Sequence, residues 1–231
     1  LGLIILFSFV FFLTFKPLRK KSLLVLILFI IISGLLSIHN PSILKRNFID
    51  TIGQFKGKYY ENFLKKEANE TNLNFMIFSF HHQTHYSTAI RMFKDKPIFG
   101  HGVKMFRFEC NKYEYITPKN FENTFKTTKK QYGCSTHPHN TYMQLLSETG
   151  IIGFLSVFLV FILTCFKLIK QFRNNHKLNP ENILIIAIFI NLWPIIPTGN
   201  FFNNWLCMLY FIPISYYFYE INSKKKKEKI G

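Results

Sequence analysis

Long apolar segments are the feature that most restricts what this chain can fold into. A helix needs about 20 mainly apolar residues to cross a bilayer. The segment 150–166 carries no charged side chain. Transmembrane helices are expected at 1–15, 22–38, 150–166, 182–196 and 205–219. The sequence therefore predicts an all-α polytopic membrane protein with about five transmembrane helices.

These segments divide the chain into four regions. Residues 1–38 would form transmembrane helices 1 and 2, and residues 39–140 a large, mostly helical loop. Residues 141–223 would form helices 3 to 5, and residues 224–231 a basic tail. Because Leu1 already lies inside an apolar run, we expect the chain to be the C-terminal portion of a longer protein.

The distribution of basic residues supports this topology. The formal net charge is +17, and basic clusters occupy 16–21, 167–177 and 224–227. All three fall on one side of the expected five-helix arrangement, which the positive-inside rule assigns to the cytoplasm. The large loop then lies outside, in the periplasm if the host is bacterial. Membrane topology accounts for the charge, so lipids are expected as partners and nucleic acid is not.

The large loop has its own helical and aromatic content. Residues 84–94 can form an amphipathic helix, and an apolar patch at 75–80 precedes it. We expect a small helical cap over the membrane helices. The loop is basic on balance, which suits an anionic ligand such as a diphosphate or an acidic sugar.

The sequence His137-Pro138-His139-Asn140 stands where this loop meets the third apolar segment. Proline is favoured at the first position of a helix, so a helix starting at Pro138 would place His139 in its first turn. The field of the helix N-terminus lowers the pKa of a histidine there, and a neutral imidazole can act as a general base. Asn140 would orient the ring or bind a sugar hydroxyl. His137 would contact substrate.

The register of this helix has two alternatives. A start at Pro138 places Gly150 and Gly153 on the same side as His139, leaving a shallow groove for a lipid chain or another helix. Glu148 would then face almost the opposite way. If Thr141 and Gln144 instead form a capping box, the helix begins later and the facing argument weakens.

An arginine and two glycines form a second candidate group earlier in the loop. Arg91 is followed by Pro97-Ile98-Phe99-Gly100-His101-Gly102. A helix ending before Pro97, then a turn through Gly100 and Gly102, would bring the backbone close to a ligand. The guanidinium of Arg91 could hold a phosphate by a bidentate contact. The alternative is an ordinary solvated surface charge, as expected for Lys94, Lys96, Lys104 and Arg107.

For several other side chains, a structural and a functional interpretation both stay open. The paired histidines with Cys134 and His101 could hold zinc, but the spacing matches no common site, and no metal is expected. The cluster His81, His82 and His85 could bind metal or lie in a wet interface. An oxidising outer compartment permits a disulfide between Cys110 and Cys134.

Taken together, these motifs resemble a known family. His139-Asn140, nine residues, and then Gly150-x-x-Gly153 resembles the signature of the O-antigen ligase/polymerase superfamily. The order Arg91, Pro97-x-x-Gly100-x-Gly102 and Phe106 is similar to that family's earlier element in the same loop. The resemblance covers roughly residues 20–220.

The resemblance implies a bacterial inner-membrane glycosyltransferase with a GT-C-like fold, of which this chain is the C-terminal half. Its donor would be a glycan on polyprenyl diphosphate. Its acceptor would be lipid A–core, a second lipid-linked glycan or a protein hydroxyl, in lipopolysaccharide or surface polysaccharide synthesis. It implies no cofactor, no metal and an inverting reaction. Arg91 would bind the diphosphate and His139 would be the base.

Two departures from the family pattern leave an alternative. Phe154-Leu155 follows the second glycine where the ligase signature often has Thr-Gly, and about five spans replace the usual ten or more. The alternative is a non-catalytic truncated module, or a transporter subunit that binds anionic glycans. A transporter should carry charges or broken helices within its spans, and these spans carry almost none.

Overall fold

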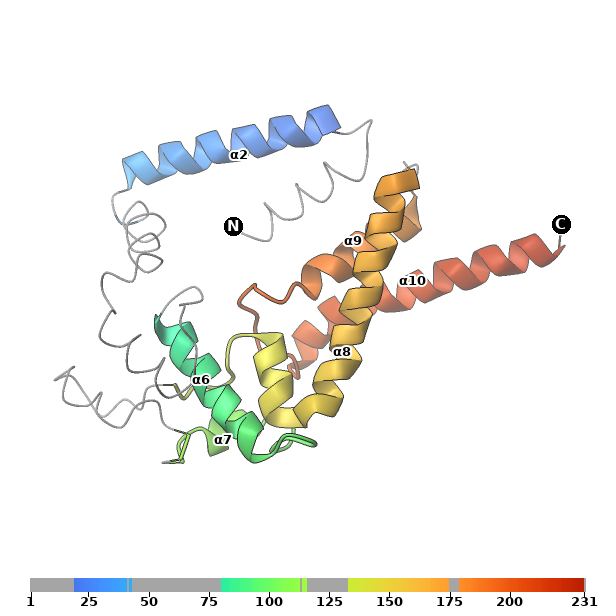
Figure 1. Cartoon of the computed structure of the whole chain (residues 1–231). Coiled ribbons are helices and arrows are strands. Elements are labelled where there is room, and N and C mark those ends of the chain that lie inside the picture. Colours follow the sequence, from blue (N-terminus) through green and yellow to red (C-terminus); the bar gives the residue numbers. More distant parts are fainter. Residues whose placement is uncertain are drawn as a thin grey trace. The chain divides into compact units, whose positions relative to one another are not determined.

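A computed structural model describes residues 19–40, 42, 80–112, 114–115, 133–174 and 179–230. Within these ranges all regular elements are helices (Figure 1). The chain divides into two compact units. One comprises Leu1–Ile32, Leu155–Ile196 and Phe201–Gly231, and the other comprises Ser33–Phe154 and Pro197–Asn200. The expected first span, 1–15, and the apolar patch at 75–80 lie outside the described residues apart from Phe80.

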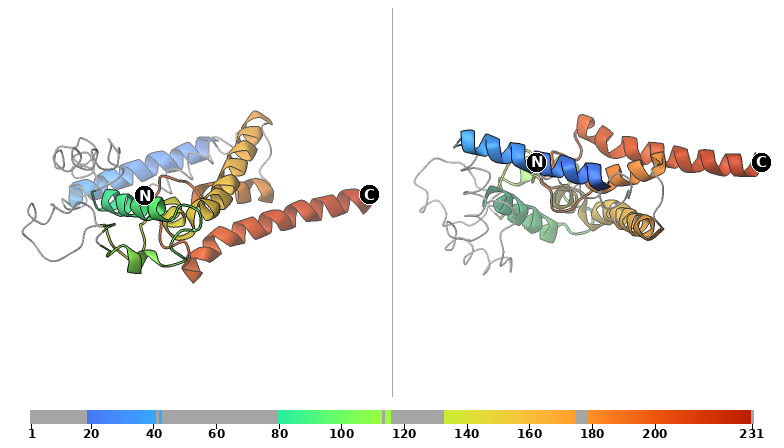
Figure 2. Two further views of the ribbon diagram at one scale, coloured as in Figure 1. Left: turned by 60° about the horizontal axis from the view of Figure 1, so that its bottom comes forward. Right: turned by 90° about the horizontal axis from the view of Figure 1, so that it is seen from above.

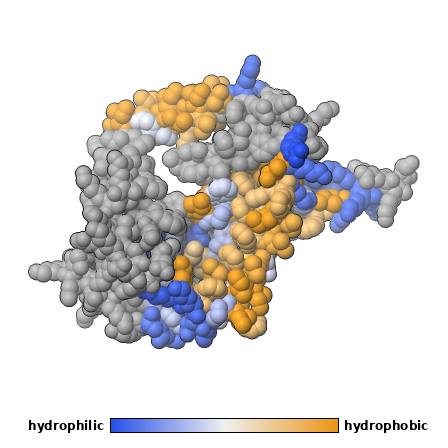
Figure 3. Space-filling view, in the orientation of Figure 1, coloured by the Kyte–Doolittle hydropathy of each residue, from blue (hydrophilic) through white to orange (hydrophobic). Residues whose placement is uncertain are grey.

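Helix α2 (Arg19–His39) occupies the second expected span. Its basic start and apolar body follow the sequence pattern, and apolar side chains on several sides are exposed, among them Leu24, Ile30 and Leu35. Apolar exposure around the helix is typical of a segment that faces lipid. Figure 3 shows apolar surface along α2 and along α8.

Helix α8 (Thr141–Asn174) contains the third expected span. Among the described residues, its segment Thr141–Gln171 is the one helix long and apolar enough to cross a membrane. The helical backbone is interrupted at Gly150, where φ is 66° and ψ is −162°. This combination of angles is essentially restricted to glycine. The part after the break exposes Leu155, Leu159 and Leu163 at four-residue intervals.

Helices α9 (Pro180–Asn191) and α10 (Asn204–Ile230) pack against each other, as Figure 2 shows. Asn179 caps α9 by accepting a hydrogen bond from the Asn182 N–H at 2.8 Å. In the C-terminal part of α10, Lys224 Nζ lies 2.6 Å from Glu181 Oε2 at the start of α9 and forms an ion pair with it. Within the same unit, Phe161 of α8 stacks on Phe189 of α9 with ring centroids 5.8 Å apart.

These helices differ from the expected spans in their limits. The fourth span was expected at 182–196, but α9 has 12 residues and ends at Asn191, so it is only about 18 Å long. The apolar stretches Leu23–Leu36 and Pro180–Asn191 are both shorter than a full span. Helix α10 continues through the lysines of the expected tail to Ile230. The number of five spans stays a prediction.

The unit built around the expected cap contains α6 (Phe80–Asp95) and α7 (Phe106–Glu109). The predicted helix at 84–94 is confirmed, as is its end before Pro97. The hydrophobic core of this unit consists of Ala89, Met92, Phe106, Cys110 and Tyr115. Two hydrogen bonds hold Tyr115 against α6. Its hydroxyl donates to Asp95 Oδ2 at 2.7 Å, and its carbonyl accepts from the Thr88 hydroxyl at 3.2 Å.

Two phenylalanines on α7 provide a stability test of this core. Phe106 is fully buried, whereas Phe108 is 65% exposed. Phe106→Ala should lower the free energy of unfolding by about 3–5 kcal/mol, because it removes apolar contacts and leaves a cavity. Phe108→Ala is the matched control and should change it little. Thermal unfolding of the two detergent-solubilised variants would measure the difference, and equal effects would contradict this core assignment.

Candidate functional site

Asn140 sets the start of α8 and therefore the position of the histidine pair. Its Oδ1 accepts hydrogen bonds from the N–H groups of Tyr142 at 3.0 Å and Met143 at 3.1 Å. Asparagine is among the preferred N-cap residues because its side chain satisfies such otherwise unpaired donors. The helix begins at Thr141, so the register that starts at Pro138 is wrong. The later start is correct, with Asn140 rather than a Thr141–Gln144 box as the cap.

His139 lies just before the helix in a left-handed conformation, with φ 56°. A positive φ is uncommon outside glycine, although histidine, asparagine and aspartate adopt it more readily than other residues. The His139 carbonyl accepts a hydrogen bond from the Thr198 N–H at 3.0 Å. The ring is therefore presented from a fixed turn, outside the helix, and the expected alignment of His139 with Gly150 and Gly153 along one helix face does not occur.

His137 is held through both ring nitrogens. Nε2 lies 3.3 Å from the carbonyl oxygen of Thr198, and Nδ1 lies 3.0 Å from the Thr136 hydroxyl. A carbonyl can only accept, so Nε2 carries the proton, and in the neutral ring Nδ1 accepts from the hydroxyl. Thr198 thus anchors both histidines from the segment between α9 and α10. His137 has no ring nitrogen left to act as a base in this arrangement.

Three imidazoles from two segments lie around His139. Its ring centroid lies 4.2 Å from that of His137, 5.3 Å from that of His85 and 5.9 Å from that of His82. His82 and His85 come from consecutive turns of α6. The sequence predicts an interfacial or metal-binding cluster here and does not reveal the proximity of these residues to His139. The three-residue spacing on one helix face was the available signal.

Burial lowers the pKa values of both histidines and so favours their neutral forms. It lowers the pKa of His139 below its ordinary value of 6.5. It also lowers the pKa of His137, to which the charges of His139 and Arg107 contribute, against the opposing effect of the Thr198 hydrogen bond. Desolvation disfavours the charged form of an imidazole. The expected cause of a lowered pKa was the field of a helix N-terminus, and burial is the cause instead.

A buried carboxylate connects the site to α7. Glu148 is fully buried. Its two oxygens accept hydrogen bonds from the N–H groups of Lys104 at 3.0 Å and Phe106 at 3.1 Å, and from Gln144 Nε2 at 2.9 Å. Gln144 also donates to Asn200 Oδ1 at 2.8 Å. Glu148 therefore joins α8 to α7 directly, and Gln144 extends the hydrogen bonds to the segment 197–200.

Gly100 and Gly150 allow two backbones to approach closely. A Cβ at Gly150 would lie 2.3 Å from the Ile98 carbonyl oxygen, and a Cβ at Gly100 would lie 2.4 Å from the Glu148 carbonyl carbon. The α8 backbone, rather than a ligand, is what the Gly100 turn approaches. Gly150 faces this turn and not an open groove. Both glycines have positive φ, as does Gly102, with φ 107°.

The same turn completes the backbone hydrogen bonding at the break in α8. The N–H groups of His101 and Gly102 donate to the carbonyls of Ser147 at 3.0 Å and Glu148 at 2.8 Å, and Ile151 N–H donates to the Pro97 carbonyl at 2.8 Å. A helix interruption leaves such groups without intrahelical partners. The Pro97–Gly102 motif therefore satisfies groups that the Gly150 break exposes.

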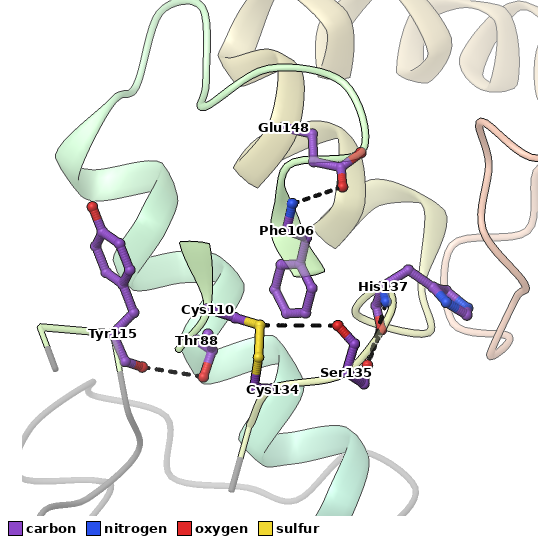
Figure 4. The surroundings of a disulfide bond; sticks show 8 residues. All are labelled: Thr88, Phe106, Cys110, Tyr115, Cys134, Ser135, His137 and Glu148. Atoms are coloured by element: carbon purple, nitrogen blue, oxygen red, sulfur yellow. Dashed lines mark hydrogen bonds between the residues drawn. A yellow bond between two sulfur atoms is a disulfide. The ribbon is translucent and has the colours of Figure 1, made fainter. Parts of the chain in front are cut away.

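A disulfide joins α7 to the loop that carries the histidines (Figure 4). Cys110, at the end of α7, is bonded to Cys134, with their Cα atoms 5.2 Å apart. Cys110 Sγ also lies 3.9 Å from the Ser135 carbonyl oxygen. The Ser135 hydroxyl in turn donates to the His137 carbonyl. The covalent link thus ends at the residue before the Ser135–His137 turn.

The zinc alternative built on Cys134 and His101 is wrong. Cys134 is in the disulfide, and the buried His101 ring has Nε2 3.0 Å from the Met92 carbonyl oxygen. Its other partners are the carboxylates of Asp95 and Glu109, at 3.6 and 3.7 Å. Across the parts of the chain that the structure describes, no group of three or more His, Cys, Asp or Glu residues is arranged to hold a metal.

The remaining predicted residues lie in the same unit. Arg91 is half-buried on α6, six residues after His85, which corresponds to about 9 Å along the helix axis. Gly153 follows the α8 break, where a Cβ would lie 2.0 Å from Thr149 Oγ1. Arg107 on α7 is exposed and close enough for its charge to act on His137. The roles of these residues toward a substrate stay predictions.

A family model described as O-antigen ligase matches residues 1–158, more than half of the chain. The chain belongs to the O-antigen ligase family. The family is membrane-embedded and glycosyltransferase-like, and it acts on lipid-linked glycans. Membership indicates glycan transfer of the O-antigen ligase or polymerase type. Neither a search of curated proteins nor a search of solved structures gave a match.

The matched range of this O-antigen ligase family member contains α6, α7, the histidine pair and the break in α8. The expected family resemblance is confirmed. The match ends before α9 and α10, although Thr198 and Asn200, between those helices, hold the histidine loop and Gln144. The site as described therefore includes residues beyond the matched range.

The close contact at Gly150 predicts that adding one methyl group there will lower the stability of the protein. Gly150→Ala should destabilise the unit because it forces a non-glycine residue into a backbone conformation that costs on the order of 1–3 kcal/mol, and adds the overlap with Ile98. Gly34→Ala is the control, because a Cβ at Gly34 would meet nothing within 4 Å. Thermal unfolding in detergent should show a lower midpoint for the first variant alone. Equal midpoints would contradict the described contact.

Proposed function

We propose that this family member transfers a glycan from polyprenyl diphosphate to an acceptor hydroxyl at the periplasmic face of the bacterial inner membrane. The observation that carries the proposal is the presentation of His139. Its ring projects from a fixed left-handed turn, is partly exposed, and has a pKa lowered by burial. A positioned neutral imidazole is suited to general base catalysis near neutral pH.

His139, rather than His137, is the proposed base. Both ring nitrogens of His137 have partners, the Thr198 carbonyl and the Thr136 hydroxyl. His137 would therefore be a positioning residue that packs against His139 at 4.2 Å between centroids. Asn140 is also proposed to act by position, because its Oδ1 already accepts two backbone hydrogen bonds.

The proposed reaction is a single displacement. His139 accepts the proton of the acceptor hydroxyl, and the acceptor oxygen forms a bond with the anomeric carbon. The bond from that carbon to the diphosphate oxygen breaks, and the diphosphate leaves on the polyprenyl carrier with an added negative charge. Attack opposite the leaving group inverts the anomeric centre. This scheme needs no metal, because the leaving group is already activated.

Cations would stabilise the charge that develops on the diphosphate. Arg91 is the proposed contact, through charge-assisted hydrogen bonds that strengthen as the bond to the sugar breaks. Arg107 adds positive potential at the histidine pair. The proposed acceptor is lipid A–core for a ligase or a second lipid-linked glycan for a polymerase. Gly100, Gly102, Gly150 and Gly153 are proposed to shape the site through backbone placement.

Complementation of a knockout strain tests the assignment. His139→Gln and Arg91→Ala should each abolish or strongly reduce polymer attached at the cell surface, measured as the polysaccharide ladder. His39→Gln and Arg173→Ala are matched controls, since both side chains are exposed on other helices, and they should leave the ladder intact. Membrane levels of each variant must be equal. Normal ladders from both site variants would reject the mechanism.

The phenotype of the inactive variants separates the two acceptors. Core-only lipopolysaccharide would identify a ligase, and core capped with a single repeat would identify a polymerase. Either result supports glycan transfer, and each assigns a different acceptor hydroxyl to His139.

The pH dependence of transfer gives a second test. Because the pKa of His139 is lowered, its neutral form persists into mild acid, and the acid limb of the rate profile should lie below pH 6.5, the ordinary value. His85→Glu would place a carboxylate beside the ring, stabilise the imidazolium and move that limb to higher pH. His85→Gln is the uncharged control and should not. An unchanged limb in the glutamate variant would contradict His139 as the titrating base.

A further inference from the structure

The turn between α6 and α7 exposes a group of apolar side chains. Ile98, Phe99 and Val103 are 55%, 76% and 53% exposed. Single exposed apolar residues are ordinary, but a contiguous group on a soluble surface marks an interaction site. We call Ile98, Phe99 and Val103 the apolar tip. None of the proposed catalytic groups belongs to it.

The apolar tip is fixed in its exposed position. The turn is pinned at Pro97, His101 and Gly102 by the backbone hydrogen bonds to α8, and Gly100 N–H donates to the Lys96 carbonyl at 3.1 Å. The glycine contacts leave no space for the turn to move closer to α8. The backbone that carries the tip therefore cannot move toward α8 without losing these bonds.

Exposed lysines flank the tip in the sequence. Lys94 and Lys96 precede it and Lys104 follows it, and all three are exposed. Asp95 lies among them, but its carboxylate accepts from Tyr115 and lies near His101. An apolar centre with a cationic rim matches the boundary of a phospholipid bilayer, where apolar side chains reach the acyl chains and lysines reach the phosphates.

The turn that carries the tip is also hydrogen-bonded to α8. The Pro97 carbonyl accepts a hydrogen bond from Ile151, the first residue after the break in α8. Ile152 beside it is 50% exposed, and the apolar body of the candidate span follows. The turn that carries the tip is therefore bonded to the residue from which the apolar part of α8 continues.

We propose that Ile98, Phe99 and Val103 insert into the phospholipid leaflet at the Gly150 end of the α8 span, with Lys94, Lys96 and Lys104 at the lipid phosphates. The partner is the bilayer that the chain itself crosses. This anchor would hold the histidine site at a fixed height above the acyl chains, because the same turn is bonded to the helix that Asn140 starts.

A depth measurement on the full chain tests this anchor without measuring glycan transfer. The free cysteines Cys165 and Cys207 are first changed to alanine, and the Cys110–Cys134 disulfide is left oxidised. An environment-sensitive fluorophore is then attached to Phe99→Cys, Val103→Cys, Lys96→Cys or Glu114→Cys. Glu114 is exposed and outside the tip, so its label is the aqueous control. The proteins are reconstituted in phosphatidylethanolamine–phosphatidylglycerol vesicles without any polyprenyl donor.

The labels should report a gradient of depth. At positions 99 and 103, emission should shift to the blue, nitroxides on lipid acyl chains should quench it, and aqueous iodide should lose its effect relative to position 114. At position 96, headgroup nitroxides should quench best. Iodide quenching at 99 and 103 equal to that at 114 would overturn the proposal. Protection from iodide without quenching by lipid nitroxides would also overturn it, by showing a protein contact instead.

Discussion

The break in α8 at Gly150 is the constraint on which the cap depends. It leaves carbonyl groups before it and an N–H group after it without helical partners, and the Pro97–Gly102 turn supplies them. Two glycines permit this approach, because any side chain at Gly100 or Gly150 would overlap opposing backbone. Motifs that are nearly fifty residues apart in the sequence are thus halves of one contact.

Glu148 extends this contact toward the site. Its carboxylate accepts a hydrogen bond from the N–H of Phe106 at the start of α7. Gln144 donates hydrogen bonds to both this carboxylate and Asn200. The disulfide holds the other end of α7 to the loop before His137. A short helix that could not persist alone is fixed at both ends, and it carries Arg107 close enough for its charge to act on His137. The position of this cation follows from the packing around it.

The site itself shows how a reactive histidine is distinguished from its neighbours. His137 and His139 are separated by one proline, yet one is held through both nitrogens while the other projects from a left-handed turn. Burial disfavours the charged form of both rings. The proposed division into a positioning residue and a base rests on hydrogen bonding, which sequence spacing does not reveal.

The sequence alone determined the features that depend on local chemistry: helical apolar segments, the amphipathic helix ending before Pro97, and the family to which the histidine and glycine motifs belong. It left the helix start open between Pro138 and a later start with a Thr141–Gln144 capping box, and the hydrogen bonds that Asn140 accepts decide for the later start. Only the tertiary structure brought His82 and His85 to His139, buried Glu148 and matched Gly100 to Gly150. Each of these contacts joins segments that are distant in the sequence. Local conformational propensity does not indicate which backbone segment will pack against a given glycine.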